Sequence, residues 1–476
     1  MPATRMKAPE FGVNANWLNT DVPVRIADQF GKVVLLEFVH EGDVKCKQLI
    51  NDTVLLQKKY RDGLTAIGIL SPKFPHQGEP DHIENTINRH QIGFPLISDN
   101  NYKWFKKFGV REWPTIILID AEGYIVGAIR GKNNREKLER LIQQHLNLAE
   151  MKNIRQCNKT PLKDHLLKGD TLSYPGRVYA TENKIYVADS GHNRILEINP
   201  QGYVTRTFGS FHPGLLDGNE SDALFNSPQG MEKVNDFLYV ADSGNHAIRR
   251  IHLQTGEVHT VMGNGMPGKL NAKGYNDASQ AQLNSPWALN YYRGEVYVCM
   301  AGLNQIWKWQ LSMNQFAPLF GSGEESLRDG AAPSSSFAQP MGICGSEFGL
   351  YVVDAESSAV RLIRMPDGYV STLVGAGLFE FGDEDGAHQV ARLQHPMDIQ
   401  YDQKRQIIWI CDTYNNKLKY LRLNQRDVNT LSLQGLDEPS GLHLHNDTLW
   451  ICNTNAHQLI KLNLEHGQMS VIEVHE

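Results

Sequence analysis

The second part of the chain repeats a pattern every 43 to 58 residues, and this repeat limits the possible folds more than any other feature. Each copy begins with a proline that precedes, by 14 to 16 residues, the end of an apolar segment such as Y-V-A-D or W-I-C-D. The six prolines are Pro175, Pro228, Pro286, Pro340, Pro396 and Pro439. Six copies of one unit indicate a single repeat domain instead of several independent domains.

Each copy contains about four short strands. A polar turn follows the Y-V-A-D segment and leads into another apolar run, as in S-G-H-N-R-I-L-E-I, and a later segment ends in glycine. Four-stranded units arranged around an axis form a propeller, because closure of the ring leaves only short edges exposed. We therefore expect an all-β, six-bladed β-propeller over residues 174–476. The 41 glycines among 476 residues agree with many tight turns.

Residues 1–148 follow a different pattern, in which apolar runs alternate with segments of helical periodicity. Strands are predicted at 32–39, 64–70, 96–98, 115–120 and 124–130. Helices are predicted at 46–60, 81–91, 101–108 and 134–146. This order predicts an α/β domain whose sheet is covered by helices on both faces. The polar stretch 149–173 is expected to be a linker.

Both regions carry motifs of known families. The segment Y-V-A-D-S-G after a P-x-G turn resembles the NHL repeat, and residues 31–38 (G-K-V-V-L-L-E-F), 71–74 (S-P-K-F) and 110–115 (V-R-E-W-P-T) resemble a thioredoxin-like domain. In this order the two regions resemble the NHL repeat-containing protein 2 family. The resemblance implies a thioredoxin-like fold followed by an NHL propeller. Animal members carry a further C-terminal domain, so we expect a bacterial-type relative without it.

The resemblance also implies a C-x-x-C pair where the first buried strand meets the first helix. Residues 38–47 instead read F-V-H-E-G-D-V-K-C-K, which puts Asp43 at the first cysteine position and Cys46 at the second. A carboxylate cannot form a mixed disulfide, so we expect two-thiol exchange to be lost. Asp43 is then expected to cap the helix, with proton acceptance from Cys46 as the alternative. Cys46 is either a buried relic or a reactive single thiol.

A proline loop is the second candidate feature of this domain. Pro114, which follows Trp113, matches the family's cis-proline beside the active site. The resemblance implies that this loop shapes a groove, which makes Trp113 and Pro114 candidate binding residues. A cis-proline that serves only to form the turn fits equally well. A peptide-binding groove could also be retained after thiol exchange has been lost.

Acidic residues recur at the ends of the Y-V-A-D segments of the propeller. They are Asp189, Asp242, Asp354 and Asp412. Because they recur in most copies, we favour a structural role in capping the following turn, with ligand binding at the loop face as the alternative.

Cysteines and histidines of the repeats give no recognisable ligand set. Cys299, Cys411 and Cys452 occupy the place that Ala or Val takes in other copies, which indicates small buried positions. His192 and His246 lie in the polar turns and leave a metal-dependent propeller enzyme as an alternative. We predict no cofactor and no assigned metal ligand. Cys157, in the linker, is expected to be exposed.

The net charge of the propeller indicates which class of partner to expect. Residues 149–476 contain 27 Lys and Arg against 36 Asp and Glu, a net charge of −9 within a chain of net charge −6. An acidic propeller speaks against nucleic acid as a partner. No secretory signal and no 18-residue apolar run occur. We therefore expect a cytoplasmic protein without membrane association, whose partner is an unknown protein or small-molecule ligand.

Together these features favour an interaction or scaffold protein over an enzyme. The degenerate thioredoxin-like domain would accompany a propeller that serves as a binding platform. A thiol-dependent redox protein that uses Cys46, either thiol-disulfide oxidoreductase or peroxidase-like, is the first alternative. A metal-dependent propeller enzyme is the second.

Overall fold

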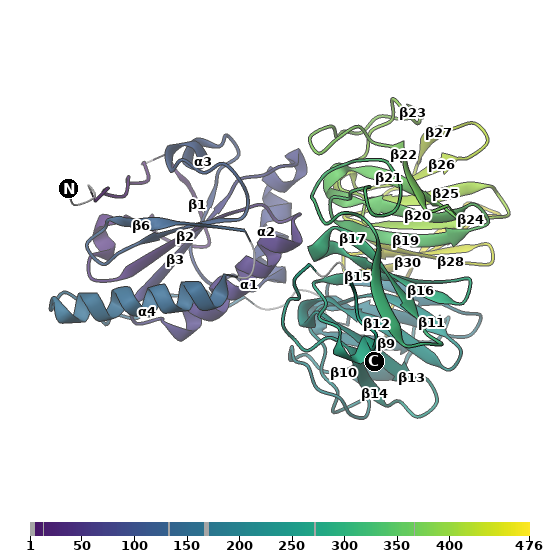
Figure 1. Ribbon diagram of the computed structural model, residues 1–476, viewed down its shortest axis with the longest axis horizontal. Helices are drawn as coiled ribbons and strands as arrows, with labels where there is room; N and C mark the ends of the chain where they lie inside the picture. The colour runs from purple at the N-terminus through teal and green to yellow at the C-terminus, as the bar shows by residue number, and fades with distance from the viewer. Residues whose placement is uncertain (1–4, 13, 132–133, 166–170, 271–272, 366) are drawn as a thin grey trace. The chain divides into compact units, whose positions relative to one another are not determined.

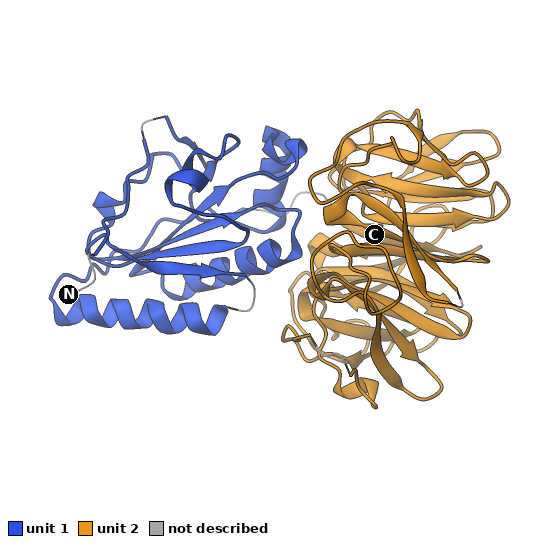
Figure 2. Cartoon of the chain, turned by 45° about the horizontal axis from the view of Figure 1, so that its top comes forward, with its two compact units in different colours: residues 1–167 blue, residues 168–476 orange. Residues whose placement is uncertain are grey.

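The chain folds as two units, residues 1–167 and residues 168–476 (Figure 2). The computed structural model describes residues 5–12, 14–131, 134–165, 171–270, 273–365 and 367–476. Among these residues no helix combines the length and the apolar composition needed to span a bilayer. The first unit is α/β and the second is all-β, as the sequence predicted (Figure 1).

Unit 1 is built on a six-stranded mixed sheet with the strand order β1-β4-β3-β2-β5-β6. The strands are β1 (Asn16–Leu18), β2 (Val33–Val39), β3 (Leu64–Leu70), β4 (Leu96–Ser98), β5 (Thr115–Ile119) and β6 (Ile125–Arg130). β2 pairs in parallel with β3 and antiparallel with β5. Every residue of β2, β3 and β5 is buried, which explains their continuous apolar runs.

Helices complete the two cores of this unit. They are α1 (Val44–Lys59), α2 (Pro80–Arg89), α3 (Lys103–Lys107) and α4 (Arg135–Met151), with short 3-10 turns at Ala27–Gln29 and Pro75–Gly78. Alternate residues of β2 serve different cores: Leu35 packs with Leu49 of α1, whereas Leu36 packs with Trp104 of α3. The predicted strands and helices are all present. The edge strand β1, only three residues long, was not predicted.

The segment predicted as a linker belongs largely to unit 1. α4 continues to Met151, and the chain beyond it hydrogen-bonds back to the unit: the Gln156 amide donates to the Gly31 carbonyl (2.9 Å) and the Lys163 amide to the Gly93 carbonyl (2.8 Å). Residues 166–170 of the predicted linker lie outside the described residues. Backbone hydrogen bonds therefore carry the first domain past residue 148, to about residue 165.

Unit 2 is a six-bladed propeller in which each blade is a meander of four antiparallel strands from consecutive residues. Blades 1 to 3 are β7 (Pro175–Ala180), β8 (Ile185–Asp189), β9 (Arg194–Ile198) and β10 (Val204–Gly209); β11 (Pro228–Val234), β12 (Phe237–Asp242), β13 (Ala247–His252) and β14 (Val258–Met262); β15 (Pro286–Tyr292), β16 (Glu295–Met300), β17 (Gln305–Gln310) and β18 (Gln315–Phe320). Blades 4 to 6 are β19 (Pro340–Ser346), β20 (Gly349–Asp354), β21 (Ala359–Arg364) and β22 (Tyr369–Val374); β24 (Asp398–Asp402), β25 (Ile407–Asp412), β26 (Lys417–Arg422) and β27 (Asp427–Leu431), with β23 (Gly386–Ala387) added at its edge; β28 (Pro439–His445), β29 (Thr448–Asn453), β30 (Gln458–Asn463) and β31 (Met469–Ile472). The blades run from teal to yellow in Figure 1.

The polar turn of each repeat holds the blades together. A residue with positive φ ends the turn, and its side chain accepts a hydrogen bond from a backbone N–H just before the first strand of the next blade, at 2.8 to 3.1 Å. The six acceptors are Asn193, His246, Asn304, Ser358, Asn416 and His457. The sixth bond, from the Tyr174 amide to His457 Nδ1, joins blade 6 to blade 1.

The ring is closed by further contacts between its ends. Val178 and Val187 of blade 1 share a hydrophobic core with Trp450 and Cys452 of blade 6. The Val204 amide donates to the His475 carbonyl (2.8 Å), so the segment after β31 continues along the outer strand of blade 1. Closure thus uses the same inter-blade core and turn bond as every other pair of blades.

Candidate functional site

The predicted thiol site lies where β2 leads into α1. Asp43 is the N-cap of α1, and its side chain accepts a hydrogen bond from the Lys45 amide at 2.6 Å. This contact satisfies one of the backbone donors that a helix leaves open at its start. The capping role predicted for Asp43 is therefore present in the structure.

Cys46 occupies the first turn of α1 and is fully buried. It belongs to the core formed with Val39, Leu49 and Ile50. All six cysteines lie within the described residues and form no disulfide with one another, and Cys157 is the exposed one, as predicted. Dithiol–disulfide exchange needs a second thiol in this motif, and Asp43 stands in its place.

A third side chain, not singled out from the sequence, joins these two. One donor atom each of His40, Asp43 and Cys46 lies within 4.8 Å of the other two, and all three residues are buried. Gln77 Nε2 lies 3.4 Å from His40 Nδ1. The signal in the sequence was the spacing H-x-x-D-x-x-C. It did not single out His40, because the three residues span a strand–helix junction and so do not lie on one face of a single element.

The predicted proline loop lies against this cluster. The Trp113–Pro114 peptide is cis, which confirms the predicted isomer. The Trp113 ring meets His40 edge-on at 5.0 Å between centroids and also packs on Phe105 at 5.1 Å. Trp113 is half-buried and Pro114 buried. Their role in binding stays a prediction.

A buried carboxylate beside two cationic side chains and a histidine follows His40 in the chain. Glu41 lies 3.1 Å from Lys47, 3.6 Å from Arg89 and 3.6 Å from His90. Burial alone would raise the pKa of Glu41, but Lys47, His90 and Arg89 together hold it well below its usual range. This carboxylate therefore stays ionised and neutralises part of the positive charge around the start of α1.

A second buried carboxylate, Glu37, lies in the middle of β2. Its side chain is fully buried, and burial raises its pKa to about 7. Burial likewise raises the pKa of Asp52 on α1 to about 6. Neither residue was predicted from the sequence, where Glu37 reads as one polar letter inside an apolar strand.

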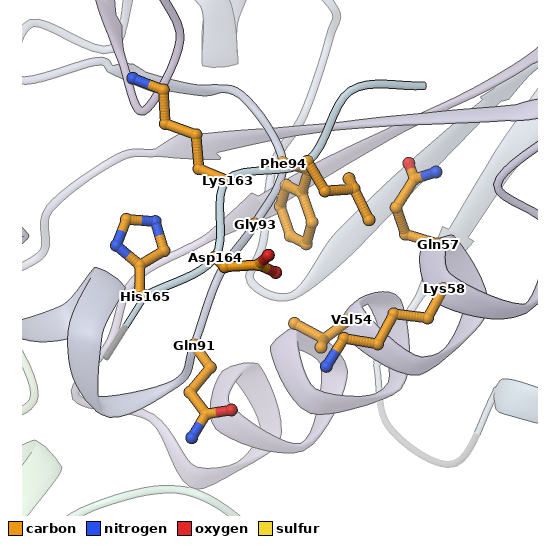
Figure 3. A pocket seen from close by; sticks show the side chains of 10 residues that line it. Val54, Gln57, Lys58, Gln91, Gly93, Phe94, Lys163, Asp164 and His165 are labelled. Atoms are coloured by element: carbon orange, nitrogen blue, oxygen red, sulfur yellow. The ribbon is translucent and has the colours of Figure 1, made fainter. Parts of the chain in front are cut away.

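Two small pockets lie among the described residues of unit 1. A pocket of about 70 Å³ lies where the chain after α4 crosses α1, lined by residues such as Gln57, Lys58, Gln91, Lys163 and His165 (Figure 3). A second, of about 10 Å³, is bordered by His40, Gln77 and His82. Volumes of this size are on the scale of a few water molecules.

The recurring propeller carboxylates lie inside the blades. Asp189, Asp242, Asp354 and Asp412 are all fully buried. Each accepts a hydrogen bond from a backbone N–H 16 or 18 residues earlier in the chain. Each also faces a cation on the third strand of its blade, namely Arg194 (2.8 Å), Arg249 (3.0 Å), Arg361 (3.6 Å) and Lys419 (3.6 Å). A ligand on the loop face has no access to these carboxylates.

The turn histidines are also used within the propeller. His192 Nδ1 lies 2.8 Å from Asp189, and His246 Nδ1 accepts the inter-blade bond from the Ser285 amide at 3.0 Å. Burial lowers the pKa of His246 to about 4. Within the described part of unit 2, no group of three metal-ligating side chains comes together.

The centre of the ring is occupied by an ion pair. The equivalent inner-strand positions of the six blades hold Arg177, Gly230, Ala288, Gly342, Asp398 and Gly441. Arg177 Nε lies 3.3 Å from Asp398, and the guanidinium also donates to the carbonyls of Met341 (2.9 Å), Met397 (2.6 Å) and Ser440. Arg177 therefore links blades 1, 4, 5 and 6, and its side chain is buried between their inner strands.

Comparison with known proteins agrees with this architecture. The AhpC/TSA family matches residues 4–128. NHL repeat-containing protein 2 of Bos taurus is 33% identical over 98% of this chain and 71% of its own length. Protein SUPPRESSOR OF QUENCHING 1, chloroplastic, of Arabidopsis thaliana is 32% identical over 98% of this chain and 48% of its own length. Thiol-disulfide oxidoreductase ResA of Bacillus thuringiensis subsp. konkukian (strain 97-27) is 26% identical over 30% of this chain and 82% of its own length.

The match to the bovine protein extends through both units and covers more than two thirds of either chain. A thioredoxin-like domain followed by a six-bladed propeller is also what the fold contains. The chain therefore belongs to the NHL repeat-containing protein 2 family.

Proposed function

We propose that this protein is an interaction protein, in which the NHL propeller is a platform for a protein or small-molecule ligand and the thioredoxin-like unit does not carry out two-thiol exchange. The acidic propeller favours such a partner over nucleic acid, and we place the protein in the cytoplasm, away from membranes.

The proposal that the thioredoxin-like unit does not carry out two-thiol exchange rests on one observation. Asp43, at the position where a thiol would begin the exchange, caps α1, and Cys46 is fully buried behind it. An exchange reaction needs an accessible thiolate and a second thiol that resolves the mixed disulfide. Neither requirement is met by this pair of residues.

The platform is best sought on one face of the propeller. Because strand direction alternates within a blade, the turns after the second strand and the connections between blades emerge on the same side. Four of these connections are long, and they expose Phe211 and Met266, which are 51% and 59% accessible. Since Arg177 and Asp398 are buried and paired with each other at the centre, this exposed rim is a better place for a ligand.

The redox half of the proposal is tested by activity assays on the full chain. We expect the wild type to reduce insulin disulfides with dithiothreitol no faster than the uncatalysed reaction, and Cys46→Ser to behave identically. Robust turnover that disappears in Cys46→Ser would overturn the proposal.

The binding half is tested by affinity capture with matched surface variants. A partner that uses the rim should be retained by the wild type and lost from Phe211→Ser combined with Met266→Ser. Met313→Ser combined with Phe348→Ser, whose residues lie in turns on the opposite side and are 64% and 47% exposed, should retain it. Equal loss from both double variants would contradict a platform on the rim.

A single-thiol redox protein is the second candidate, because His40 lies beside Cys46. An imidazole near a thiol can take its proton and leave a nucleophilic thiolate. Such a thiolate attacks a peroxide, breaks the O–O bond and becomes a sulfenic acid as hydroxide leaves. Peroxide consumption that falls at least tenfold in Cys46→Ser but persists in Cys157→Ser would favour this candidate.

A further inference from the structure

We propose that His40, Asp43 and Cys46 form a binding site for one divalent transition-metal ion of the zinc class. This site goes beyond the proposed function, which assigns no metal. It unites three residues, spaced three apart in sequence, that converge where β2 ends and α1 begins.

The distances bring the site close to the geometry of a bound ion. The three donor atoms all lie within 4.8 Å of one another. A tetrahedral zinc ion with bonds of about 2.0–2.3 Å holds its ligands roughly 3.3–3.8 Å apart. The donors therefore need to approach one another by at most about 1.5 Å to reach this geometry.

The donor chemistry selects the kind of ion. Imidazole nitrogen, carboxylate oxygen and thiolate sulfur are the three ligand types of zinc sites, whereas calcium and magnesium require oxygen ligands. Ionised Asp43 and Cys46 contribute two negative charges, which neutralise a divalent cation in a buried site. Three protein ligands leave a fourth tetrahedral position for water or a ligand.

The ligands are carried and oriented by rigid parts of the fold. His40 follows β2 directly, Asp43 is the N-cap of α1 and Cys46 lies in its first turn. The Lys45 amide holds one oxygen of Asp43 at 2.6 Å, and the Trp113 ring packs edge-on against His40. Partners of this kind fix the orientation of metal ligands.

The residue that removes dithiol chemistry is thus the one that completes the ligand set. A carboxylate at position 43 cannot form a disulfide with Cys46, so oxidation within the motif does not consume the thiolate ligand. The same substitution supplies the oxygen donor.

Cobalt(II) titration of the reduced full-length protein tests the site. We expect one Co²⁺ per chain with thiolate-to-cobalt charge-transfer absorption, which an equivalent of Zn²⁺ abolishes. Cys46→Ser should lose this absorption, and Cys157→Ser, which removes the exposed thiol, should keep it. Asp43→Asn and His40→Ala should each weaken Co²⁺ binding at least tenfold.

Two outcomes overturn the proposal: the wild type shows no charge-transfer absorption, or Cys46→Ser retains it. If circular dichroism shows that Cys46→Ser does not fold, X-ray absorption spectroscopy of zinc-loaded Cys157→Ser shows instead whether a sulfur atom binds the metal. We expect one sulfur at about 2.3 Å with nitrogen and oxygen at about 2.0–2.2 Å, and a shell without sulfur would contradict the site. The insulin and capture assays do not depend on metal. Their results therefore test the proposed function separately from the metal site.

Discussion

Asp43 shows how one side chain can change the chemistry open to a fold while leaving the fold intact. It stands where the family resemblance implies a cysteine, yet the first turn of α1 keeps its capping bond because a carboxylate accepts it as well as any N-cap residue. The hydrogen bonding at the start of α1 is thus preserved, and the effect that we propose for Asp43 concerns thiol exchange alone.

We expect Asp43→Ala to lower the free energy of unfolding by about 1 kcal/mol, because the Lys45 amide loses its acceptor. Asp43→Ser keeps a capping oxygen and serves as the control. Denaturant unfolding of the full chain measures both. Equal stability of Asp43→Ala and the wild type would show that the cap does not contribute.

Glu37 should make stability depend on pH. Its folded pKa is about 7 against an ordinary value of 4.5, so between these values the folded state binds a proton that the unfolded chain releases. The free energy of unfolding therefore falls as pH rises through this window. We expect Glu37→Gln to match the wild type near pH 4 and to exceed it by up to about 3 kcal/mol at pH 8.

Denaturant unfolding at both pH values checks this expectation, and Glu136→Gln, at an exposed position of α4, is the control. The same pH-dependent gain in Glu136→Gln would contradict the role assigned to the buried carboxylate.

At the scale of elements, the polar turn of each repeat connects one blade to the next. In four of the six blades an aspartate before this turn binds the preceding segment of its own blade, and in all six the last residue of the turn binds the next blade. Three of the long connections add a second aspartate to the cation on the third strand, as Asp217 does to Arg249 at 3.0 Å. The repeated motif therefore serves to hold the blades together, and its recurrence does not indicate a catalytic site.

One of these inter-blade hydrogen bonds should depend on pH, because its acceptor is the imidazole of His246. Its folded pKa of about 4 lies below the ordinary 6.5, so the unfolded chain binds more protons between these values and stability is lost as pH falls through them. His246→Asn restores the residue of blades 1, 3 and 5 and accepts the same bond without titrating. We expect the variant to be more stable than the wild type at pH 4, by up to about 3 kcal/mol, and similar at pH 8.

Thermal unfolding in buffers between pH 4 and 8 measures this difference. A variant that loses stability on acidification as steeply as the wild type would contradict the assignment.

At the scale of the whole propeller, the ion pair at the centre connects blades that are not neighbours. Arg177 reaches from blade 1 to backbone carbonyls of blades 4 and 5, and Asp398 also accepts from the Leu442 amide of blade 6 at 2.7 Å. At the equivalent positions a side chain is mostly excluded: a Cβ on Gly230 would lie 2.6 Å from the backbone of Ala288. One long side chain thus bridges inner strands that in three other blades carry glycine at the equivalent position.

We expect Arg177→Met and Asp398→Asn each to destabilise the propeller by roughly 3–5 kcal/mol, because each leaves buried polar groups without a partner. The double variant should cost less than the sum of the two, since it leaves no unpaired charge. Calorimetry of the full chain tests both statements. Fully additive losses would mean that the two residues do not act as a pair.

The fold was largely predictable because its signals are local and repeated. Periodicity gave the sheet and helices of unit 1, and six copies of one motif gave the propeller. The boundary after residue 148 was less accurate, because the polar composition of 149–165 does not reveal that its amides bond to unit 1. Asp43 and Cys46 were found by alignment with a motif, whereas His40, Glu37 and Glu41 were not, because burial and neighbours decide their chemistry.

By itself, the sequence determined the family, the order of the two domains, the number of blades and the missing first cysteine. Each of these is encoded in residue types and spacings along the chain. Only the tertiary structure decided that the repeated aspartates are buried, that Arg177 closes the centre, and that His40 joins Asp43 and Cys46. The physical reason is that charge, accessibility and ligand geometry depend on distances between residues that folding alone brings together.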